Sequence, residues 1–361
     1  MPGAGLDPYL FQGFYKPVKI SAMRRKWFFI LIPFVLLLLY FTGPRPSKPA
    51  YSLVFPELPD SPSAVQQEVR QEESAHHLKP DNEARIIWAN DTMKEVTDYS
   101  IVYLHGFSAS QKEGDPVHRN IAAEFGCNLY LSRLAEHGID TSEQLINLTA
   151  DKYWESAKRA LAIGRKLGKK VILMGTSTGA SMALQLAADY PKDVSALILL
   201  SPNISINDPF AWILNDPWGL QIARMVRHGN YIVSDDDRPE YRRYWSKPYR
   251  LEAVVALEEY LETAMTTENF EKVKQPTLVL YYYRDPVHQD SVVKVSAKLK
   301  MFDELGTPPA LKRKRAMPNT GDHVIGSPIK SHDVQSVQNE IENFFITVLH
   351  ISPANRPVLS H

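Results

Sequence analysis

The sequence predicts an α/β fold in which helices flank a mostly parallel central sheet. Short apolar segments recur along the chain and alternate with stretches of helical periodicity, which is the rhythm of βαβ units. One apolar segment leads into a Gly-x-Ser-x-Gly turn, which is followed by a helix pattern of small residues. A later stretch, residues 203–268, interrupts the alternation of strands and helices. The predicted strands are residues 85–88, 101–104, 128–131, 171–174, 196–200, 277–283 and 311–317.

The last predicted strand and the last predicted helix each have a distinctive pattern. Residues 311–317 read LKRKRAM, and a charged strand suits a sheet edge because its charges prevent pairing with another molecule. Residues 333–351 have the pattern of an amphipathic helix with one apolar face. The residues of that face are Val334, Val337, Ile341, Phe344 and Phe345.

The segment 175–179, Gly-Thr-Ser-Thr-Gly, is the strongest indication of chemistry. The pattern alone also fits a Gly/Ser-rich loop, but its position between a strand and a helix is that of a nucleophile elbow. Glycines suit this turn because side chains would strike the neighbouring backbone. The turn presents the Ser177 hydroxyl above the sheet, where the next helix aims its free N–H groups.

Other polar residues follow Ser177 in the order Asp, His. Asp285 comes after the strand 277–283, so it lies at the carboxyl edge of the sheet, where ligands bind in open α/β folds. His323 lies in a turn before the last helix. Upstream, the strand 100–104 leads directly into His105-Gly106-Phe107, at the place of an oxyanion-binding loop.

Together these segments resemble capped serine hydrolases of the α/β-hydrolase superfamily, in the style of the monoacylglycerol lipase, carboxylesterase and serine aminopeptidase branch. The resemblance extends over residues 85–350 and implies the α/β-hydrolase fold with a helical cap. The threonines on each side of Ser177 vary among the relatives and could narrow the space around the nucleophile. The matching segments are 104–107, 133–138, 175–179, 284–287 and 321–324.

A serine hydroxyl is a weak nucleophile at neutral pH and needs a base within hydrogen-bond reach. We expect His323 to be that base, and Asp285 to orient the imidazole and stabilise its charged form. Asp285 could instead form a turn ahead of Pro286, and Asp290 and Asp322 are then the alternative acids.

Backbone N–H groups of Phe107 and Thr178 are expected to hold the oxyanion of the tetrahedral intermediate. His105 and His137 are expected to support the neighbouring loops rather than to react.

Composition excludes several classes of protein. The 361 residues include 41 basic and 41 acidic ones, and this balance argues against a nucleic-acid partner. Neither a zinc-ligand spacing nor a nucleotide-binding glycine pattern occurs in the sequence, so we expect no metal and no cofactor. The single Cys127 cannot form an internal disulfide and is expected to be buried.

The N-terminus predicts membrane attachment. Residues 27–41 read WFFILIPFVLLLLYF, which favours a transmembrane signal anchor over 27–42. The basic residues 24–26 predict a cytoplasmic tail over 1–26 and a catalytic domain on the non-cytoplasmic side, the periplasm if the source is bacterial. A cleaved signal peptide and a buried or peripheral helix are the alternatives, although residues 42–46 lack an Ala-x-Ala-like cleavage site.

Two further segments complete the organisation. Residues 43–84 are rich in Pro, Ser and charge, which predicts a linker before a hydrolase domain over 85–351. Residues 203–268 are too long for a simple loop and predict a helical cap over the active site. Phe210, Trp212, Leu214 and Trp218 of this cap either bind an acyl chain or only pack the cap onto the body.

The sequence therefore predicts a membrane-anchored serine hydrolase that cleaves small or lipid-like carboxylic esters through an acyl-enzyme. An amidase or peptidase with the same triad, and a non-catalytic binding module that keeps the fold, are the alternatives. The oligomeric state is left open.

Overall fold

The structure is a computed structural model that describes residues 22–354, with side chains from residue 29 onward. The chain divides into two compact units, Met1–Pro44 and Arg45–His361. The second unit contains the central sheet and every element from α2 onward.

Within the described residues the central sheet has seven strands in the order β1-β3-β2-β4-β5-β8-β9. All neighbouring pairs are parallel except β1 with β3, so the predicted mostly parallel sheet is confirmed. The charged strand β9 lies at one edge, as its sequence predicts. The strands are β1 (Arg85–Ile87), β2 (Thr97–Leu104), β3 (Asn128–Leu131), β4 (Gly168–Thr176), β5 (Val194–Leu200), β8 (Thr277–Tyr281) and β9 (Lys312–Ala316).

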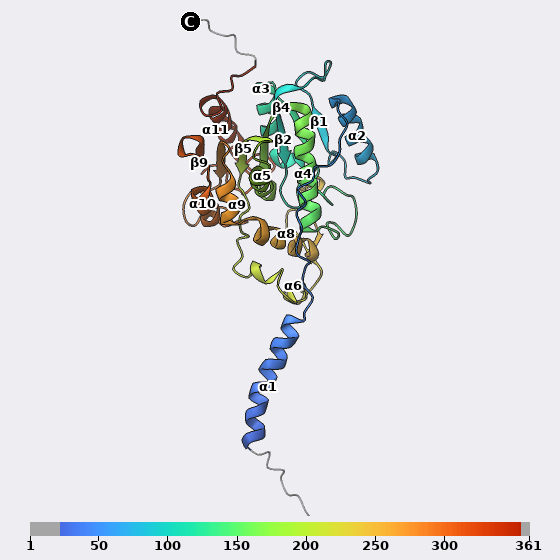
Figure 1. Ribbon diagram of the computed structural model, residues 1–361, viewed down its shortest axis with the longest axis vertical. Helices are drawn as coiled ribbons and strands as arrows, with labels where there is room; N and C mark the ends of the chain where they lie inside the picture. The colour runs from blue at the N-terminus through green and yellow to red at the C-terminus, as the bar shows by residue number, and fades with distance from the viewer. Residues whose placement is uncertain (1–21, 355–361) are drawn as a thin grey trace, which may run out of the picture. The chain divides into compact units, whose positions relative to one another are not determined.

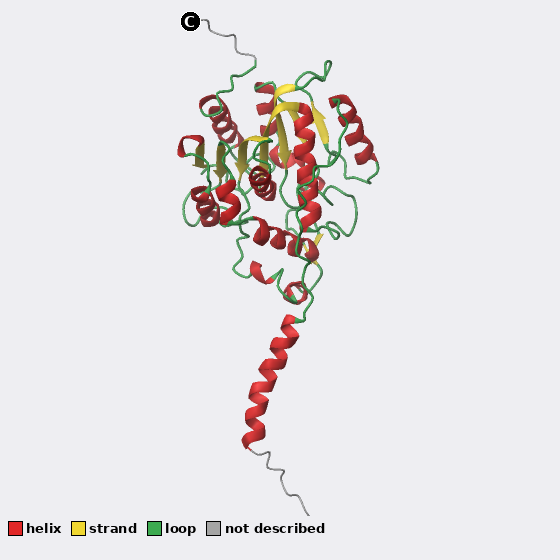
Figure 2. Ribbon diagram, in the orientation of Figure 1, coloured by secondary structure: helices red, strands yellow, loops and turns green. Residues whose placement is uncertain are grey.

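Both faces of the sheet are buried under helices, as Figure 2 shows. Successive residues of β4 point to opposite faces, so that Ile172 belongs to one hydrophobic cluster and Leu173 to the other. One cluster includes residues of α3 and α11, and the other includes residues of α4, α5, α8, α9 and α10. Burial on both faces explains why these strands are continuous apolar runs rather than alternating ones.

The flanking helices are α3 (Val117–Glu124), α4 (Ala150–Leu167), α5 (Thr178–Asp189), α10 (Val295–Glu304) and α11 (Val334–Thr347). Short 3₁₀ turns occur at η1 (Gln111–Gly114) and η3 (Pro309–Leu311).

The segment between β5 and β8 holds the expected cap. It is mostly helical, and Figure 1 shows α6 and α8 beyond one end of the central sheet. Its elements are η2 (Ala211–Ile213), α6 (Gly219–Arg227), β6 (Tyr231–Ile232), α7 (Pro239–Tyr244), β7 (Tyr249–Arg250), α8 (Leu251–Ala264) and α9 (Thr267–Lys272), with β6 and β7 forming a two-stranded sheet.

Residues 45–84 are packed against the hydrolase body, which corrects their prediction as a linker. Val65 and Val69 of α2 (Pro62–Ser74) are buried in the main hydrophobic cluster. Trp154 Nε1 and Lys158 Nζ of α4 both donate to the Ser52 carbonyl at 2.8 Å. The segment is polar on average, and this average obscured a few apolar residues on one face of α2. These residues are enough to pack the segment against the body.

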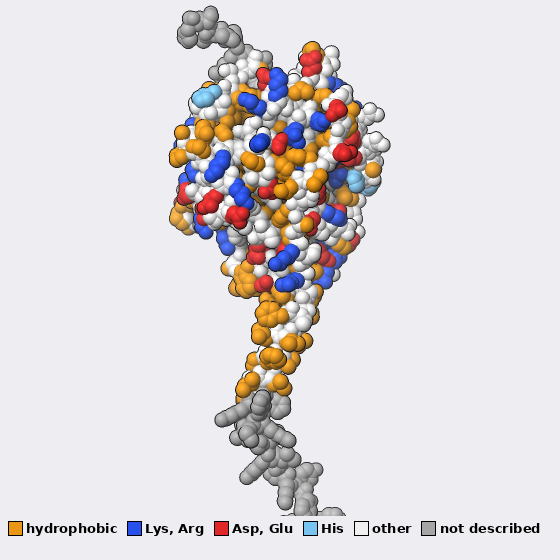
Figure 3. Space-filling view, in the orientation of Figure 1, with side chains coloured by type: hydrophobic (Ala, Val, Ile, Leu, Met, Phe, Trp, Pro, Cys, Tyr) orange, Lys and Arg blue, Asp and Glu red, His pale blue; other side chains and the backbone are white. Residues whose placement is uncertain are grey.

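The other unit contains α1 (Ala22–Phe41), whose described surface is covered by hydrophobic side chains (Figure 3). No helix in the described part of the chain is long and apolar enough to cross a membrane, so the predicted transmembrane anchor is not found. Residues 24–26 of the 20-residue helix are basic, which shortens its apolar part to residues 27–41. The predicted tail over 1–26 lies mostly outside the described residues, and the non-cytoplasmic placement stays a prediction.

Candidate active site

Ser177 occupies a sharp turn between β4 and α5, as the nucleophile elbow requires. Its backbone is in a sparsely populated region with φ 53° and ψ −122°. A Cβ at Gly179 would lie 2.0 Å from the Leu104 carbonyl oxygen, and one at Gly175 would lie 2.6 Å from the Ala180 nitrogen. Both glycines are therefore needed for the close approach of backbone that forms the turn.

Ser177 and His323 line the same cavity, which has a volume of about 430 Å³. The Nε2 atom of His323 is buried and has no hydrogen-bond partner among the described residues. The other ring nitrogen, Nδ1, lies 2.7 Å from the Oδ2 atom of Asp290. An ionised carboxylate only accepts hydrogen bonds, so Nδ1 carries the proton and Nε2 is left as the acceptor.

The structure places Asp290, rather than the predicted Asp285, beside His323. The Asp285 carboxylate is exposed and bonds to the His288 ring at 2.9 Å and to the backbone N–H of Val287. The cause is the course of the chain after β8, which ends at Tyr281 and turns back on itself. Asp285 therefore lies in an exposed turn, the alternative considered from the sequence.

The returning segment brings Asp290 to the edge of the sheet. The Asp290 N–H donates to the Tyr282 carbonyl, and Tyr283 bridges to Gln289 in antiparallel fashion. Asp322, the second alternative, accepts from the Val324 N–H and does not bond to the histidine ring.

Asp290 is only 2% exposed, and both of its carboxylate oxygens accept hydrogen bonds. Oδ2 accepts from His323 Nδ1 and from Lys298 Nζ, each at 2.7 Å. Oδ1 accepts from the backbone N–H groups of Val292 and Val293. Burial acts to raise the pKa of Asp290, but the histidine ring and the Lys298 ammonium outweigh it and hold the pKa well below its usual range.

Lys298 was not singled out from the sequence. Its side chain has 0% exposure, and burial lowers its pKa even though Asp290 favours the charged form. The sequence does hold a signal, since Lys298 follows Val295 by three residues and precedes Met301 by three on the buried face of α10. A lysine on an apolar helix face requires a buried anion as partner.

The loop after β2 is supported by two buried histidines, in line with the sequence analysis. His105 Nδ1 bonds to the Gly106 carbonyl at 2.9 Å and Nε2 accepts from the Leu134 N–H. His137 Nε2 accepts from the Ser108 N–H at 3.0 Å. Burial lowers the pKa of His105 to about 4, so its ring is neutral and can accept.

Phe107, which the sequence predicts to bind the oxyanion, lines the Ser177 cavity, and Thr178 begins α5 directly after Ser177. Within residues 22–354 neither backbone N–H donates a hydrogen bond. Both are therefore free to bind an oxygen of a bound substrate.

Glu113 is a second buried carboxylate at the site and was missed by the sequence analysis. One of its oxygens accepts from the Gly106 N–H at 2.5 Å, and its side chain lines the Ser177 cavity. A Cβ on Gly106 would lie 2.9 Å from either carboxylate oxygen and 3.0 Å from Ser177 Cβ, so the groups are close neighbours. Burial raises the pKa of Glu113 to about 7, and the Gly106 N–H opposes this shift.

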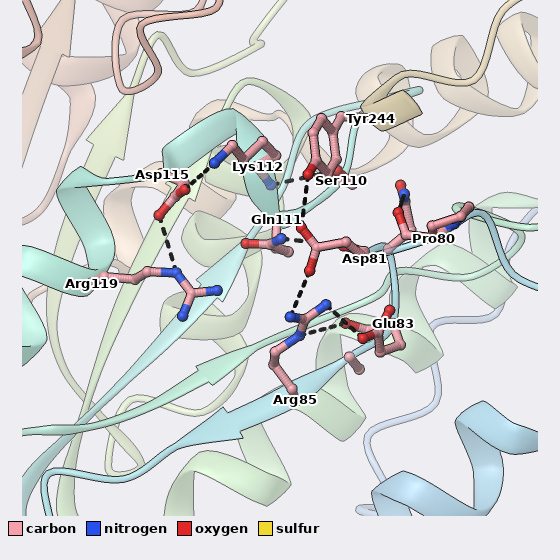
Figure 4. Close-up of polar contacts among 12 residues, drawn as sticks. Pro80, Asp81, Glu83, Arg85, Ser110, Gln111, Lys112, Asp115, Arg119 and Tyr244 are labelled. Carbon is pink, nitrogen blue, oxygen red and sulfur yellow. Dashed lines mark hydrogen bonds and ion pairs between the residues drawn. The ribbon is translucent and has the colours of Figure 1, made fainter. Parts of the chain in front are cut away.

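A polar network holds the segment that carries Glu113 (Figure 4). Asp81 accepts from the Tyr244 hydroxyl of α7 at 2.8 Å and pairs with Arg85 of β1 at 2.6 Å. The Asp81 carbonyl accepts from Gln111 Nε2 of η1 at 3.3 Å. Asp81 therefore links the cap, the sheet and the loop beside Ser177.

The cap encloses a second, mostly apolar cavity of about 520 Å³. Of the four predicted substrate-binding residues, Phe210 and Leu214 line this cavity, whereas Trp212 and Trp218 are not among its lining residues. Ile206, Tyr249 and Val254 line both cavities, so the apolar space adjoins the Ser177 cavity.

The described residues contain no group of three or more His, Cys, Asp or Glu that could hold a metal ion.

Comparison with known proteins gives the same fold. A sequence family described as serine aminopeptidase, S33, matches residues 149–313. A structure of metagenome-derived lipolytic enzymes is 15% identical, with a TM-score of 0.55 over 74% of this chain and 98% of that chain. The chain has the α/β-hydrolase fold. The fold implied by the resemblance of the sequence motifs is thereby confirmed.

Two further structures extend the comparison. A monoacylglycerol lipase from Paleococcus ferrophilus is 14% identical, with a TM-score of 0.53 over 73% of this chain and 97% of that chain. A monoglyceride lipase from Saccharomyces cerevisiae is 13% identical, with a TM-score of 0.52 over 73% and 89% of the two chains. A search of curated protein sequences gives no match.

Proposed function

We propose that this α/β-hydrolase is a serine hydrolase that cleaves carboxylic esters through Ser177, His323 and Asp290. One observation carries the proposal. The His323 ring is held at Nδ1 by a buried, ionised carboxylate, Nε2 has no partner among residues 22–354, and His323 lines the cavity that Ser177 also lines. A base held in one tautomer beside a serine on a strained turn is the arrangement that activates a serine hydroxyl.

The reaction follows from these positions. Ser177 attacks the ester carbonyl as His323 Nε2 takes its proton, and Asp290 stabilises the imidazolium. His323 then protonates the leaving alcohol, which leaves an acyl group on Ser177. Water attacks this acyl-enzyme with His323 again as base, and the acid product and free serine form.

The backbone N–H groups of Phe107 and Thr178 are proposed to hold the oxyanion of both tetrahedral intermediates. Their freedom from other hydrogen bonds supports this role. Loss of one such donor typically lowers turnover by about 10²–10³.

We propose that the apolar cavity of the cap binds the acyl part of a lipid-like ester. Its position beside the Ser177 cavity, and its lining by Phe210 and Leu214, support this choice. The names of two structural neighbours, a monoacylglycerol lipase and a monoglyceride lipase, are consistent with it.

Labelling of the full chain by a fluorophosphonate probe tests for an activated serine. We expect stoichiometric labelling that is lost in Ser177→Ala. The matched control is Ser195→Ala, because Ser195 is the second residue of β5, at the end of the strand opposite the site. Failure to label a folded wild-type protein would contradict the proposal and favour a non-catalytic binding module.

An amidase or peptidase activity is the second candidate, since the matched sequence family is described as serine aminopeptidase. The same acyl group presented as a p-nitrophenyl ester and as a p-nitroanilide separates the two. A higher kcat/KM on the anilide than on the ester would replace the esterase proposal by this one.

A further inference from the structure

The cavity that contains Ser177 and His323 also has a cationic region. Lys247 and Lys330 both line it, together with the aromatic ring of Tyr241. Lys247 comes from the loop between α7 and β7, and Lys330 from the loop before α11. Neither lysine has a part in the proposed ester cleavage.

Lys247 has no carboxylate within ion-pair distance among the described residues, although its side chain is half-buried. Its nearest aromatic neighbours are Tyr241 and Tyr249, whose ring centroids each lie 6.0 Å from the ammonium nitrogen. Such cation–π contacts compensate only part of the hydration that a buried ammonium loses. The charge of Lys247 is therefore available for a bound anion.

The charge of Lys330 is balanced in part. Its ammonium lies 3.4 Å from Asp236 and 3.8 Å from Asp322, and it also lies 4.9 Å from the centroid of the Tyr241 ring. Asp236 is shared with Arg238, which it contacts at 2.7 Å. Asp236 thus contacts two cations and Asp322 contacts Lys330, so Lys247 remains the cavity-lining cation without a carboxylate partner among the described residues.

The groups around Lys247 also favour the binding of an anion. Burial lowers the pKa of Lys247, and the neighbouring Lys330 lowers it further, against a smaller opposing effect of Asp235 and Asp236. A bound anion would relieve this repulsion. Glu113 also lines the cavity, but burial raises its pKa to about 7, so it offsets little positive charge below that pH.

The cationic region and the apolar cap cavity are separate. Neither lysine lines the apolar cavity, which meets the Ser177 cavity at Ile206, Tyr249 and Val254. A substrate that uses both regions has an apolar part and an anionic part, with the ester bond between them.

We propose that the substrate is an acyl ester whose alcohol part carries an anionic group, a phosphate or a carboxylate, held by Lys247 and Lys330. This inference rests on the proposed esterase function and specifies its substrate class. The acyl chain occupies the cap cavity, and the anion replaces the water around the two ammonium groups.

The test uses three decanoyl esters that differ in the alcohol: glycerol, glycerol 3-phosphate and glycolate. Full-length wild type is expected to have a higher kcat/KM on the two anionic esters than on the glycerol ester. In Lys247→Gln this preference is expected to fall by roughly 10–100-fold, the factor that corresponds to one charge-assisted contact. Lys247→Arg should restore most of it, because it keeps the charge.

The matched control is Lys169→Gln, a lysine that is exposed on β4 and paired with Asp98. It is expected to leave the preference unchanged. The phosphate and carboxylate esters separate the two anion sources, since a preference for only one of them identifies it.

The inference is overturned if wild type prefers the neutral ester, or if Lys247→Gln lowers kcat/KM equally on all three. In both cases the neutral ester is still cleaved and the proposed esterase function stands. Absence of cleavage on every ester, together with absence of fluorophosphonate labelling, would contradict the esterase function itself.

Discussion

Replacement of Asp290 by asparagine is the sharpest test of the site, with Asp285→Asn as its matched control. In the structure one Asp290 oxygen accepts from two backbone N–H groups and the other from His323 and Lys298. Asparagine has only one acceptor oxygen, so either orientation directs its NH₂ group at donors. The substitution removes the charge that stabilises the imidazolium and, in one of the two amide orientations, also the acceptor that fixes the ring.

The expected loss in kcat for Asp290→Asn is on the order of 10⁴, as in a comparable triad. At about 1.36 kcal/mol per tenfold change, this is roughly 5.4 kcal/mol of transition-state stabilisation. Asp285→Asn is expected to change kcat less than about twofold, because exposed substitutions away from the site have small effects. The assay is hydrolysis of a p-nitrophenyl ester at saturating substrate.

Folding must be separated from catalysis, because Asp290→Asn also leaves the buried Lys298 without an anion. Breaking a buried pair in this way typically costs about 3–5 kcal/mol of stability. The double variant Asp290→Asn, Lys298→Met removes the stranded charge and should recover stability without recovering kcat. The reasoning is refuted if Asp285→Asn loses activity while a folded Asp290 variant retains it.

Two other substitutions probe the buried charges. Lys298→Met removes a cation that keeps the pKa of Asp290 low. The stability that comes from this depressed pKa is lost as the pH falls through the folded-state pKa. Acid unfolding of the variant should therefore occur at a higher pH than that of wild type. The pKa of Glu113 is raised from 4.5 to about 7 in the folded state. The free energy of unfolding therefore decreases as the pH rises from 4.5 to 7, by roughly 3 kcal/mol in all at 1.36 kcal/mol per pKa unit. Glu113→Gln should remove this loss, and urea unfolding at pH 5.5 and 8.5 measures it; an equal decline in wild type and variant would contradict the assignment.

The elbow could be predicted because its requirements are local. Glycine is required at positions 175 and 179 because a Cβ there would collide with neighbouring backbone. The strand, the turn and the helix of this unit are continuous in the sequence, so the whole unit can be recognised. The parallel sheet could likewise be predicted from the sequence, because strands that are buried on both faces are continuous apolar runs.

The acid could not be assigned from the sequence because its position depends on where β8 ends. The apolar run through Tyr283 suggests a strand that delivers Asp285 to the sheet edge, but pairing with β5 and β9 stops at Tyr281. The remaining residues form a small turn of their own, and this turn carries Asp290 back to the edge. The packing of residues 45–84 could not be predicted either. Few residues of this segment are apolar, and the residues they contact are distant in the chain.

Two buried carboxylates flank the proposed nucleophile and base, and their surroundings decide which of them can act in the triad. Asp290 is bonded to a buried ammonium and two backbone N–H groups, which keep it ionised. Glu113 has one backbone N–H and no cation at hydrogen-bond distance among the described residues, and its pKa is raised to about 7. Only a carboxylate that is already ionised at neutral pH can balance the positive charge that forms on His323. The opposite directions of the two shifts therefore support Asp290 as the triad acid and leave Glu113 to hold the oxyanion loop through Gly106.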